Sequence, residues 1–405
     1  MSANDRIFYA CQGVAIIDHA SQAALTSGNM IYGLQSVGVN TNFSLEQAFE
    51  LGQIEIYENI EGTPDIEVTL EKVLDGHSLI YHMASTGVKG SAAGTGLVNR
   101  SKQRCDVRLG IFPDSVNHLE DDTGAAPAEI YMSGMYISSI SYSLNSDGSS
   151  TESCTLVGNN KAWIADRGGK ITQTAVARFD GGHEPDGLGD DTTGSPSVNK
   201  ALGGVSQKED VMITHSVFPF SCLGLHGPVK TMVGSGYGNA NGLIHAQSVS
   251  VSTDFSREDI FELGKKTPYA RPAAFPIEVT CDIEVVSISG DFVEATEAGD
   301  YDLYLTTASG NNTPDEIIFV STRNGLGLDL GQKNRLQSVS YGGGDAGGGN
   351  ATSTFSYVNY NDLDVQNYNH AQGYIGFEAL KWGTAAGNKS VGPNGGAWPA
   401  GSLGS

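Results

Sequence analysis

Positive charge is scarce in this sequence. Lys and Arg account for 23 of its 405 residues, against 46 Asp and Glu, which leaves a formal net charge of −23. Charged residues of both signs make up 17% of the chain, below the ~25% of an average soluble domain. Proteins that grip nucleic acid neutralise phosphates with basic side chains, and binders of anionic membranes carry basic patches. The composition therefore argues against both classes.

Long apolar runs and paired cysteines are missing as well. No stretch reaches the ~18 apolar residues of a membrane-spanning helix. The first ten residues carry Asp5 and Arg6 and no long apolar run, so we expect no secretory signal. The five cysteines are scattered without a C-x-x-C pair, which predicts neither a zinc site nor a disulfide framework. These features fit a protein made in a reducing compartment.

Motifs of enzymatic chemistry are also lacking. The sequence has no G-x-S-x-G and no P-loop, and the glycine clusters at 342–344 and 347–349 lie between two predicted strands, as in a hairpin tip. Two acidic stretches, residues 120–122 and 180–191, lack the twelve-residue pattern of a calcium loop, so solvated loops are the favoured interpretation. We expect no catalytic residue, no metal site and no cofactor.

What the sequence does contain is a duplicated segment. Residues 35–52, QSVGVNTNFSLEQAFELG, match residues 247–264, QSVSVSTDFSREDIFELG, at 12 of 18 positions without a gap. Two shorter matches follow in the same order: IEVT at 66–69 with 277–280, and SISY at 139–142 with SVSY at 338–341. Three matches in one order predict two copies of a domain of about 130 residues.

This duplication divides the chain. We expect an N-terminal arm (1–30), a first domain (31–165), a Gly/Asp-rich connector and insertion (166–236), a second domain (237–370) and a Gly-rich C-terminal extension (371–405). Strand-like runs in residues 211–233 are compatible with a return to the second domain. In the extension, Trp382 and Trp398 are the large anchors, and we take them as candidate contacts with a neighbouring subunit, because an ordered tail needs something to lie against.

Both copies show the period-two pattern of a strand with one buried face. In residues 277–285, apolar side chains alternate with Glu278, Thr280, Asp282 and Glu284. Residues 66–73 repeat the pattern, with Glu67, Thr69 and Glu71 on the polar face and Ile66, Val68, Leu70 and Val73 on the apolar face, and the alternation slips at Lys72. We therefore predict antiparallel sheets with one packed apolar face and one exposed acidic face.

A short helix is predicted after the first strand of each copy. Ser44 and Ser256 stand where a capping box begins, and Gly52 and Gly264 stand where a C′ glycine belongs. A helix of about two turns in each copy fits these signals. The alternative is an extended loop that the glycine closes.

Residues 261–285, FELGKKTPYARPAAFPIEVTCDIEV, resemble the tail tube proteins of tailed bacteriophages. In that family a strand with Ser/Phe alternation leads into an E-L-G turn, an aromatic–Arg–Pro segment and an amphipathic strand of P-[IV]-E-V-T type, and the S-[IV]-S-Y strand is similar to its closing hairpin. The resemblance covers both copies. In the first copy Glu58-Asn59-Ile60 stands in place of Ala270-Arg271-Pro272, so the contact of Arg271 is not reproduced there.

The resemblance implies a mainly β fold. It implies two tandem β-sandwich or half-barrel domains, each with a short helix, that assemble into an inter-subunit β-barrel tube. Rings of the family hold six domains, so a chain with two domains would complete a ring as a trimer with pseudo-sixfold symmetry. The implied partners are further copies of the chain and other tail proteins, such as a sheath, a tip or baseplate and a terminator. DNA would pass through without specific binding, no membrane is involved, and the protein would be made in the host cytoplasm and located in the virion tail.

The resemblance also gives the acidic strand faces a role. We hypothesise that seven residues contribute to the channel lining: Glu67, Thr69, Glu71, Glu278, Thr280, Asp282 and Glu284. A negative lining repels DNA phosphates, so DNA slides and does not adhere. The alternative is that these side chains face external solvent.

An aromatic–Arg–Pro loop supplies the contact candidates. We take Tyr269, Arg271 and Pro272 as residues that touch another subunit or ring, because aromatic residues and Arg are enriched in interfaces. For Phe261, Leu263 and Phe275 there are two interpretations, a contact from ring to ring and a place in the domain core, and the domain core is the favoured one.

Two other functions compete with the tube. One is a trimeric tail-tip or baseplate hub ring, which a low copy number per virion would reveal. The other, from a different class, is an extracellular β-sandwich adhesin or carbohydrate-binding protein, which a glycan screen would reveal.

Overall fold

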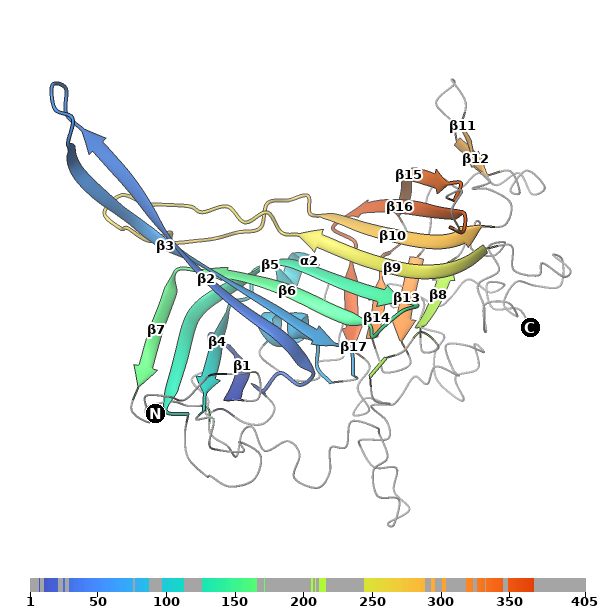
Figure 1. Cartoon of the computed structure of the whole chain (residues 1–405), viewed down its shortest axis with the longest axis horizontal. Helices are drawn as coiled ribbons and strands as arrows, with labels where there is room; N and C mark the ends of the chain where they lie inside the picture. The colour runs from blue at the N-terminus through green and yellow to red at the C-terminus, as the bar shows by residue number, and fades with distance from the viewer. Residues whose placement is uncertain are drawn as a thin grey trace, which may run out of the picture.

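A computed structural model describes residues 7, 11–20, 25, 29–75, 77–86, 97–112, 126–165, 171, 205–206, 208, 211–215, 244–287, 293–295, 301–303, 318–322, 326–331, 333–344 and 349–367. These residues form seventeen strands and two short helices (Figure 1). The mainly β class predicted from the sequence is confirmed. The tryptophans Trp382 and Trp398, and the acidic stretches at 120–122 and 180–191, lie outside the described residues.

The main sheet is antiparallel, with the strand order β15-β16-β10-β9-β5-β6-β3-β2. Its bounds are β2 (Leu34–Phe49), β3 (Ile56–Val73), β5 (Ala128–Asn145), β6 (Thr151–Gly158), β9 (Ile244–Asp254), β10 (Glu278–Ser287), β15 (Arg335–Gly342) and β16 (Thr352–Tyr360). Among the described residues of the single chain, the sheet is open and ends at β2 on one side and at β15 on the other.

Smaller sheets form a second layer. We call β2, β3, β5 and β6 the first half of the main sheet, and β9, β10, β15 and β16 the second half. Below the first half, β1 (Gln12–Asp18), β4 (Cys105–Ile111) and β7 (Asn160–Ala165) pair in the order β1-β4-β5-β7. The long strand β5 belongs to both layers, and Gly134, with φ +68°, lies between the stretch that pairs with β7 and the stretch that pairs with β6. Below the second half, β17 (Asp364–Asn367), β14 (Leu326–Asp329), β13 (Ile318–Thr322) and β8 (Val211–His215) pair in that order.

Two strands fall in segments that were expected to lie outside the domains. β1 lies within residues 1–30 and pairs with β4 over its whole length. β8 lies within residues 166–236 and pairs with β13. A separate hairpin joins β11 (Val293–Ala295) to β12 (Tyr301–Leu303).

One continuous apolar core lies between the layers. It includes Val68 and Leu70 of β3, Val279 and Cys281 of β10, and Leu328 of β14. Because alternate strand residues point to opposite faces, the predicted apolar positions enter this core, except Val73, which is half-buried and lies outside it. Lys72 is the exception to the sequence interpretation: no slip occurs there, and its side chain is fully buried on the core face.

The two halves of the main sheet share their irregularities. Gln35 and Gln247, which match in sequence, are the residues skipped where the pairing register shifts in β2–β3 and in β9–β10. A second shift skips Ser138 in β5–β6 and Gln337 in β15–β16. β-Bulges of this kind are specific features of a strand pair.

The alignment of β3 with β10 differs from the sequence match. Val39 pairs with Val68, whereas Val251, which matches Val39 in sequence, pairs with Cys281. The IEVT match is therefore two residues out of register with the structure. A shift of two residues keeps every side chain on the same face, so the expected acidic face is unaffected.

The helices predicted at Ser44–Gly52 and Ser256–Gly264 were wrong. Ser44 lies inside β2, which continues to Phe49, and the second segment has no helix. The described helices are α1 (Ile80–Thr86) and α2 (Leu97–Arg100), and neither is long enough to cross a membrane. The alternative, an extended segment closed by glycine, is what the structure shows: Gly52 has φ +93° and Gly264 has φ +87°.

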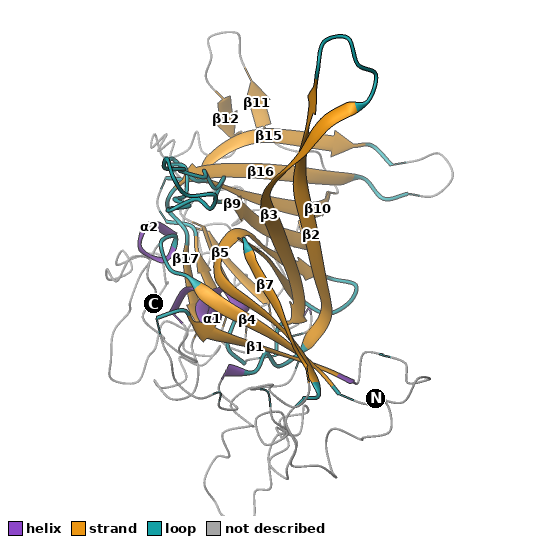
Figure 2. Ribbon diagram, turned by 90° about the vertical axis from the view of Figure 1, so that its left-hand side faces the viewer, coloured by secondary structure: helices purple, strands orange, loops and turns teal. Residues whose placement is uncertain are grey.

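Both segments belong to hairpins that we name the first arm (residues 44–62) and the second arm (256–274). Leu45 pairs with Glu61 in the first arm, and Arg257 pairs with Ala273 in the second. The first arm extends beyond the sheet, while the second runs back along the first half (Figures 1 and 2). Backbone N–H and C=O groups of each arm find hydrogen-bond partners across the hairpin, in place of the partners that a helix would provide.

Candidate assembly surface

The face of the main sheet opposite the core is polar. All seven residues predicted as a channel lining lie on it. Glu67, Thr69, Glu71 and Glu278 are exposed, and Thr280, Asp282 and Glu284 are half-buried. We call this surface the open face. The structure thus brings together residues that lie more than two hundred positions apart in the sequence.

Hydroxyl groups fill the space between the acidic residues. β5 and β9 meet on the open face through pairs of serines such as Ser141 with Ser252. Ser36 donates to Glu71 Oε2 at 3.3 Å, and Ser248 donates to Glu284 Oε2 at 3.1 Å. Among the described strand residues of this face, Arg335 at the outer edge is the one Lys or Arg. The open face therefore has very few positively charged groups that could bind an anion.

The two edges of the main sheet are of complementary kinds. In the described part of the chain, β2 pairs only with β3, and β15 pairs only with β16. Inside the chain, the strands that match them in sequence, β9 and β5, pair with each other from Ser139–Asp254 to Asn145–Ser248. The chain therefore ends in two edges whose counterparts are joined at its centre. An interface of this head-to-tail type leaves one free partner surface at each end.

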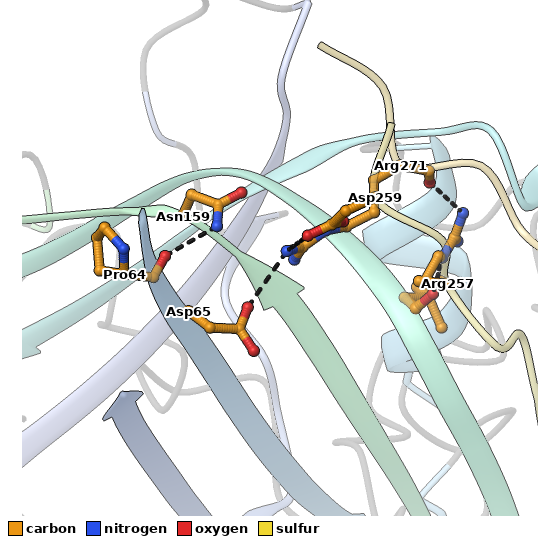
Figure 3. Close-up of polar contacts among 7 residues, drawn as sticks. Pro64, Asp65, Asn159, Arg257, Asp259 and Arg271 are labelled. Atoms are coloured by element: carbon orange, nitrogen blue, oxygen red, sulfur yellow. Dashed lines mark hydrogen bonds and ion pairs between the residues drawn. The ribbon is translucent and has the colours of Figure 1, made fainter. Parts of the chain in front are cut away.

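Arg257 fixes the base of the second arm to the first half of the sheet (Figure 3). Its Nε donates to the carbonyl of Ile137 at 2.7 Å, and its Nη1 donates to the carbonyl of Ser101 at 2.6 Å. The guanidinium also lies over the rings of Tyr136 and Phe255, 5.0 and 5.3 Å from their centroids. Burial lowers the pKa of Arg257 to about 10, which leaves it protonated at neutral pH.

Arg271 fixes the arm further along. It forms a bidentate ion pair with Asp259 of the same arm, and its Nη2 lies 3.3 Å from Asp65 Oδ1 of β3 (Figure 3). Burial disfavours its charged form, but hydrogen bonds to Asp259 and the charges of both carboxylates outweigh this and raise its pKa. Thr63 adds a hydrogen bond to the carbonyl of Lys266.

The contact candidates therefore divide. Arg271 is buried at the junction between the two halves of one chain, while Tyr269 and Pro272 beside it are exposed. The expectation that Phe261, Leu263 and Phe275 lie in the core was wrong: all three are exposed, Phe261 and Leu263 on the second arm and Phe275 directly after it.

Sequence reasoning missed the apolar character of the first arm. Phe43 at the base of the arm is exposed, and so are the apolar residues Leu45, Phe49, Leu51, Ile54, Ile56, Tyr57 and Ile60 within it. The signal that could have found it is in the alignment, since Leu45 stands where the second arm has Arg257 and Asn59 where it has Arg271.

A buried polar cluster beneath β3 has a structural role. Glu152 accepts hydrogen bonds from the backbone N–H groups of Ile80 and Tyr81 at 2.7 and 3.0 Å and from the Tyr142 hydroxyl at 3.1 Å. Burial raises the pKa of Glu152, against the opposing effects of Lys72 and these donors. The carboxylate thereby satisfies two N–H groups in the first turn of α1 that have no partner within the helix. No set of three or more metal-ligating side chains occurs in the described part of the chain.

Comparison with known proteins gives no match in sequence and three partial matches in structure. No family model and no curated protein matches the sequence. Three solved structures resemble part of the chain: the tube-terminating cap of the anti-feeding prophage, the sheath–tube complex of an extracellular contractile injection system and the anti-feeding prophage baseplate. They match 41%, 40% and 41% of this chain and 95%, 92% and 98% of theirs, at 12%, 12% and 10% identity, with TM-scores of 0.28, 0.27 and 0.27.

Proposed function

We propose that the chain is a structural, non-enzymatic protein of a phage tail, in which copies join into stacked rings that form the tail tube. The observation that carries the proposal is the open face, an acidic and hydroxyl-rich sheet surface bounded by two edge strands that each have one strand partner among the described residues. Joining such edges removes unpaired strand groups and makes one face of the sheet the wall of a channel.

We further propose that the chain is a tandem duplication. The order β5-β6-β3-β2 corresponds to β15-β16-β10-β9, and the second layers correspond as β1-β4-β5-β7 and β8-β13-β14-β17. The repeated bulges at Gln35 and Gln247 support the same reading. On this proposal β1 and β8 belong to the two domains.

A trimer gives the ring a suitable size. Each chain contributes the eight strands of the main sheet, so three chains give 24 strands. With strands about 4.8 Å apart and tilted by about 40°, a closed ring of 24 strands has a backbone diameter of about 48 Å. Side chains about 5 Å long leave a clear channel of about 38 Å, wide enough for duplex DNA.

The channel lining would then be the open face. Glu67, Glu71, Asp282 and Glu284 would repel phosphates, and the serine and threonine hydroxyls between them would keep the wall wet. A wall of this kind lets DNA pass during ejection without specific binding. The partners are further copies of the chain and adjoining tail proteins, and the location is the virion tail.

Sedimentation velocity and negative-stain microscopy of the purified full chain test this function. We expect large particles that appear as rings in projection and as hollow rods from the side. A chain that stays monomeric at all concentrations, or a clear hit in a glycan screen, would favour the adhesin. Rings that do not stack, present in few copies per virion, would favour the hub.

A further inference from the structure

We infer that the junction between chains copies the junction inside the chain, in its residue register as well as its strand order. The inference rests on the proposed assembly and adds the partner of each edge: β2 and the first arm of one copy seat on β15, β16 and β10 of a second copy. The occupant is a second copy because the internal junction already shows a matched pair of these surfaces bound to each other.

The internal pairing fixes the register between chains. Ser141 pairs with Ser252, and Ile140 pairs with Thr253. In the duplicated sequences, Ser340 matches Ser141 and Asn40 matches Ser252. The predicted antiparallel pairs between two copies are therefore Ser338–Asn42, Val339–Thr41, Ser340–Asn40, Tyr341–Val39 and Gly342–Gly38.

The β-bulge of β5 at the internal junction has a counterpart in β15 at the edge of the sheet, so the same register can form at both places. In the internal junction the N–H of Phe255 donates to the carbonyl of Ser138, the skipped residue of the β5 bulge, at 2.8 Å. β15 has the same bulge at Gln337. The carbonyl of Gln337 thus stands ready for the N–H of Phe43, the residue that matches Phe255.

Phe43 is the clearest sign of a missing neighbour. Phe255 is completely buried, whereas Phe43 is 64% exposed in the single chain. Burying an aromatic side chain of this size stabilises an interface substantially. In the proposed junction Phe43 lies against the β15 bulge of the second copy, as Phe255 lies against the β5 bulge at Ser138.

At the proposed junction between chains, the arginine comes from the strand and not from the arm. Inside the chain, Arg257 of the arm lies over Tyr136 of β5. In the alignment, the arm carries Leu45 in place of Arg257, and the strand carries Arg335 in place of Tyr136. The junction between chains therefore keeps one arginine beside the aromatic ring of Phe43, supplied by the strand. This exchange makes the two junctions chemically distinct, which discourages the second arm from competing for the β15 edge.

Disulfide trapping in the assembled full chain tests the register. Asn40 and Ser340 are exposed on the open face, and their internal counterparts Ser252 and Ser141 form a pair without mutual ladder hydrogen bonds, the closer kind of antiparallel pair. Asn40→Cys with Ser340→Cys should cross-link chains on mild oxidation, seen as a ladder on non-reducing gels that stops at three chains.

Two control pairs of cysteines show whether the cross-link depends on the register. Ser36→Cys with Ser340→Cys lies on the same strands and face but four residues out of register, and should give at least about tenfold less cross-link, because Cα atoms more than 7 Å apart are not bridged. Ser141→Cys with Ser252→Cys should close within one chain. Mixing single-cysteine chains, one with Asn40→Cys and one with Ser340→Cys, gives the same answer if the double variant misfolds.

The outcomes separate this inference from the proposed function. Rings or tubes without the in-register cross-link, or with an equal off-register one, would overturn the inference and leave the tail function standing. A ladder that extends beyond three chains would support the register and contradict the trimer. A chain that never assembles would overturn both.

A substitution at Phe43 tests whether this side chain packs against the second copy. Phe43→Asp should abolish ring formation while leaving the melting temperature of the single chain within a few degrees, because the side chain is exposed there. Leu51→Asp is the matched control, since Leu51 and its counterpart Leu263 are both fully exposed, and it should leave ring formation unchanged. Normal rings from Phe43→Asp would contradict the seat.

Discussion

Arg271 of the second arm lies with its Nη2 3.3 Å from Asp65 of β3, so a residue of one half of the sheet is ion-paired to the other half. Asp259 completes the pair from within the arm. Because the arginine is buried and the two carboxylates remain partly exposed, the contact holds the arm in place at a modest desolvation cost. It adds a side-chain contact between two halves that the pairing of β5 with β9 already joins.

Arg271→Ala should therefore destabilise the chain. The loss of charge-assisted hydrogen bonds from a buried guanidinium is expected to cost about 2 kcal/mol, and Asp65→Asn should cost less, about 0.5 kcal/mol, because Asp65 is more than half exposed. Denaturant unfolding of both single variants and the double variant measures their coupling. Independent, additive effects of the two substitutions would show that the pair does not hold the arm.

Glu152→Ala should be the more damaging change. It removes the acceptor of two helix N–H groups and of the Tyr142 hydroxyl, and we expect a loss of about 3 kcal/mol. Tyr142→Phe removes one donor only and should cost about 1 kcal/mol. Both are read from urea unfolding midpoints, and an Ala variant as stable as the Phe variant would contradict the role of Glu152 at α1.

Alkaline pH should weaken the fold through its buried thiols. Burial raises the pKa of Cys105, Cys154 and Cys281, so unfolded thiols ionise first, at about pH 8.5. The unfolded state then binds fewer protons than the folded one, and the free energy of unfolding falls as pH rises, by about 1.4 kcal/mol per pH unit for each thiol.

Cys281→Val isolates one of these thiols. Val68 occupies the matching place in β3, so the replacement suits the site. Between pH 9 and 10 the variant should lose less stability than the wild type, by about 1.4 kcal/mol. Parallel stability curves for the two proteins would show that the Cys281 thiol has the same pKa in both states, so that burial does not raise it.

Reversing the charge of the open face should create DNA binding. Wild-type assemblies should show little affinity for duplex DNA, whereas a variant with four lysines should bind it with a strong salt dependence. The four substituted residues are Glu67, Glu71, Asp282 and Glu284. A matched variant carries four lysines at exposed acidic residues away from this face, Glu50, Glu55, Asp147 and Glu258. Equal DNA binding by both variants would show that the open face has no special access to DNA.

The strand faces could be predicted because their pattern is local. Val279, Cys281 and Ile283 alternate with acidic residues, and alternation alone assigns each to a face. The helix at Ser44 was wrong because its caps are equally compatible with a hairpin whose pairing depends on residues 56–61. Gly52 serves either structure, since both need a positive φ.

The buried cluster and the arms depend on contacts that no local pattern reports. Lys72 interrupts an apolar series, yet it is buried, because its ammonium donates hydrogen bonds to Asp75 and to the carbonyl of Ser78. Arg271 and Leu263 lie on one arm, but one is buried and the other fully exposed. Which of them touches the sheet follows from how the arm lies across β3.

A cryo-electron microscopy map of the assembled protein, at a resolution that shows side chains, tests the proposed tube most directly. We predict a hollow tube whose inner wall is a continuous sheet, with the carboxylates of Glu71 and Glu284 facing the channel and β2 of each chain beside β15 of the next. A tube with these carboxylates on its outer wall, or an assembly without a channel, would contradict the proposal.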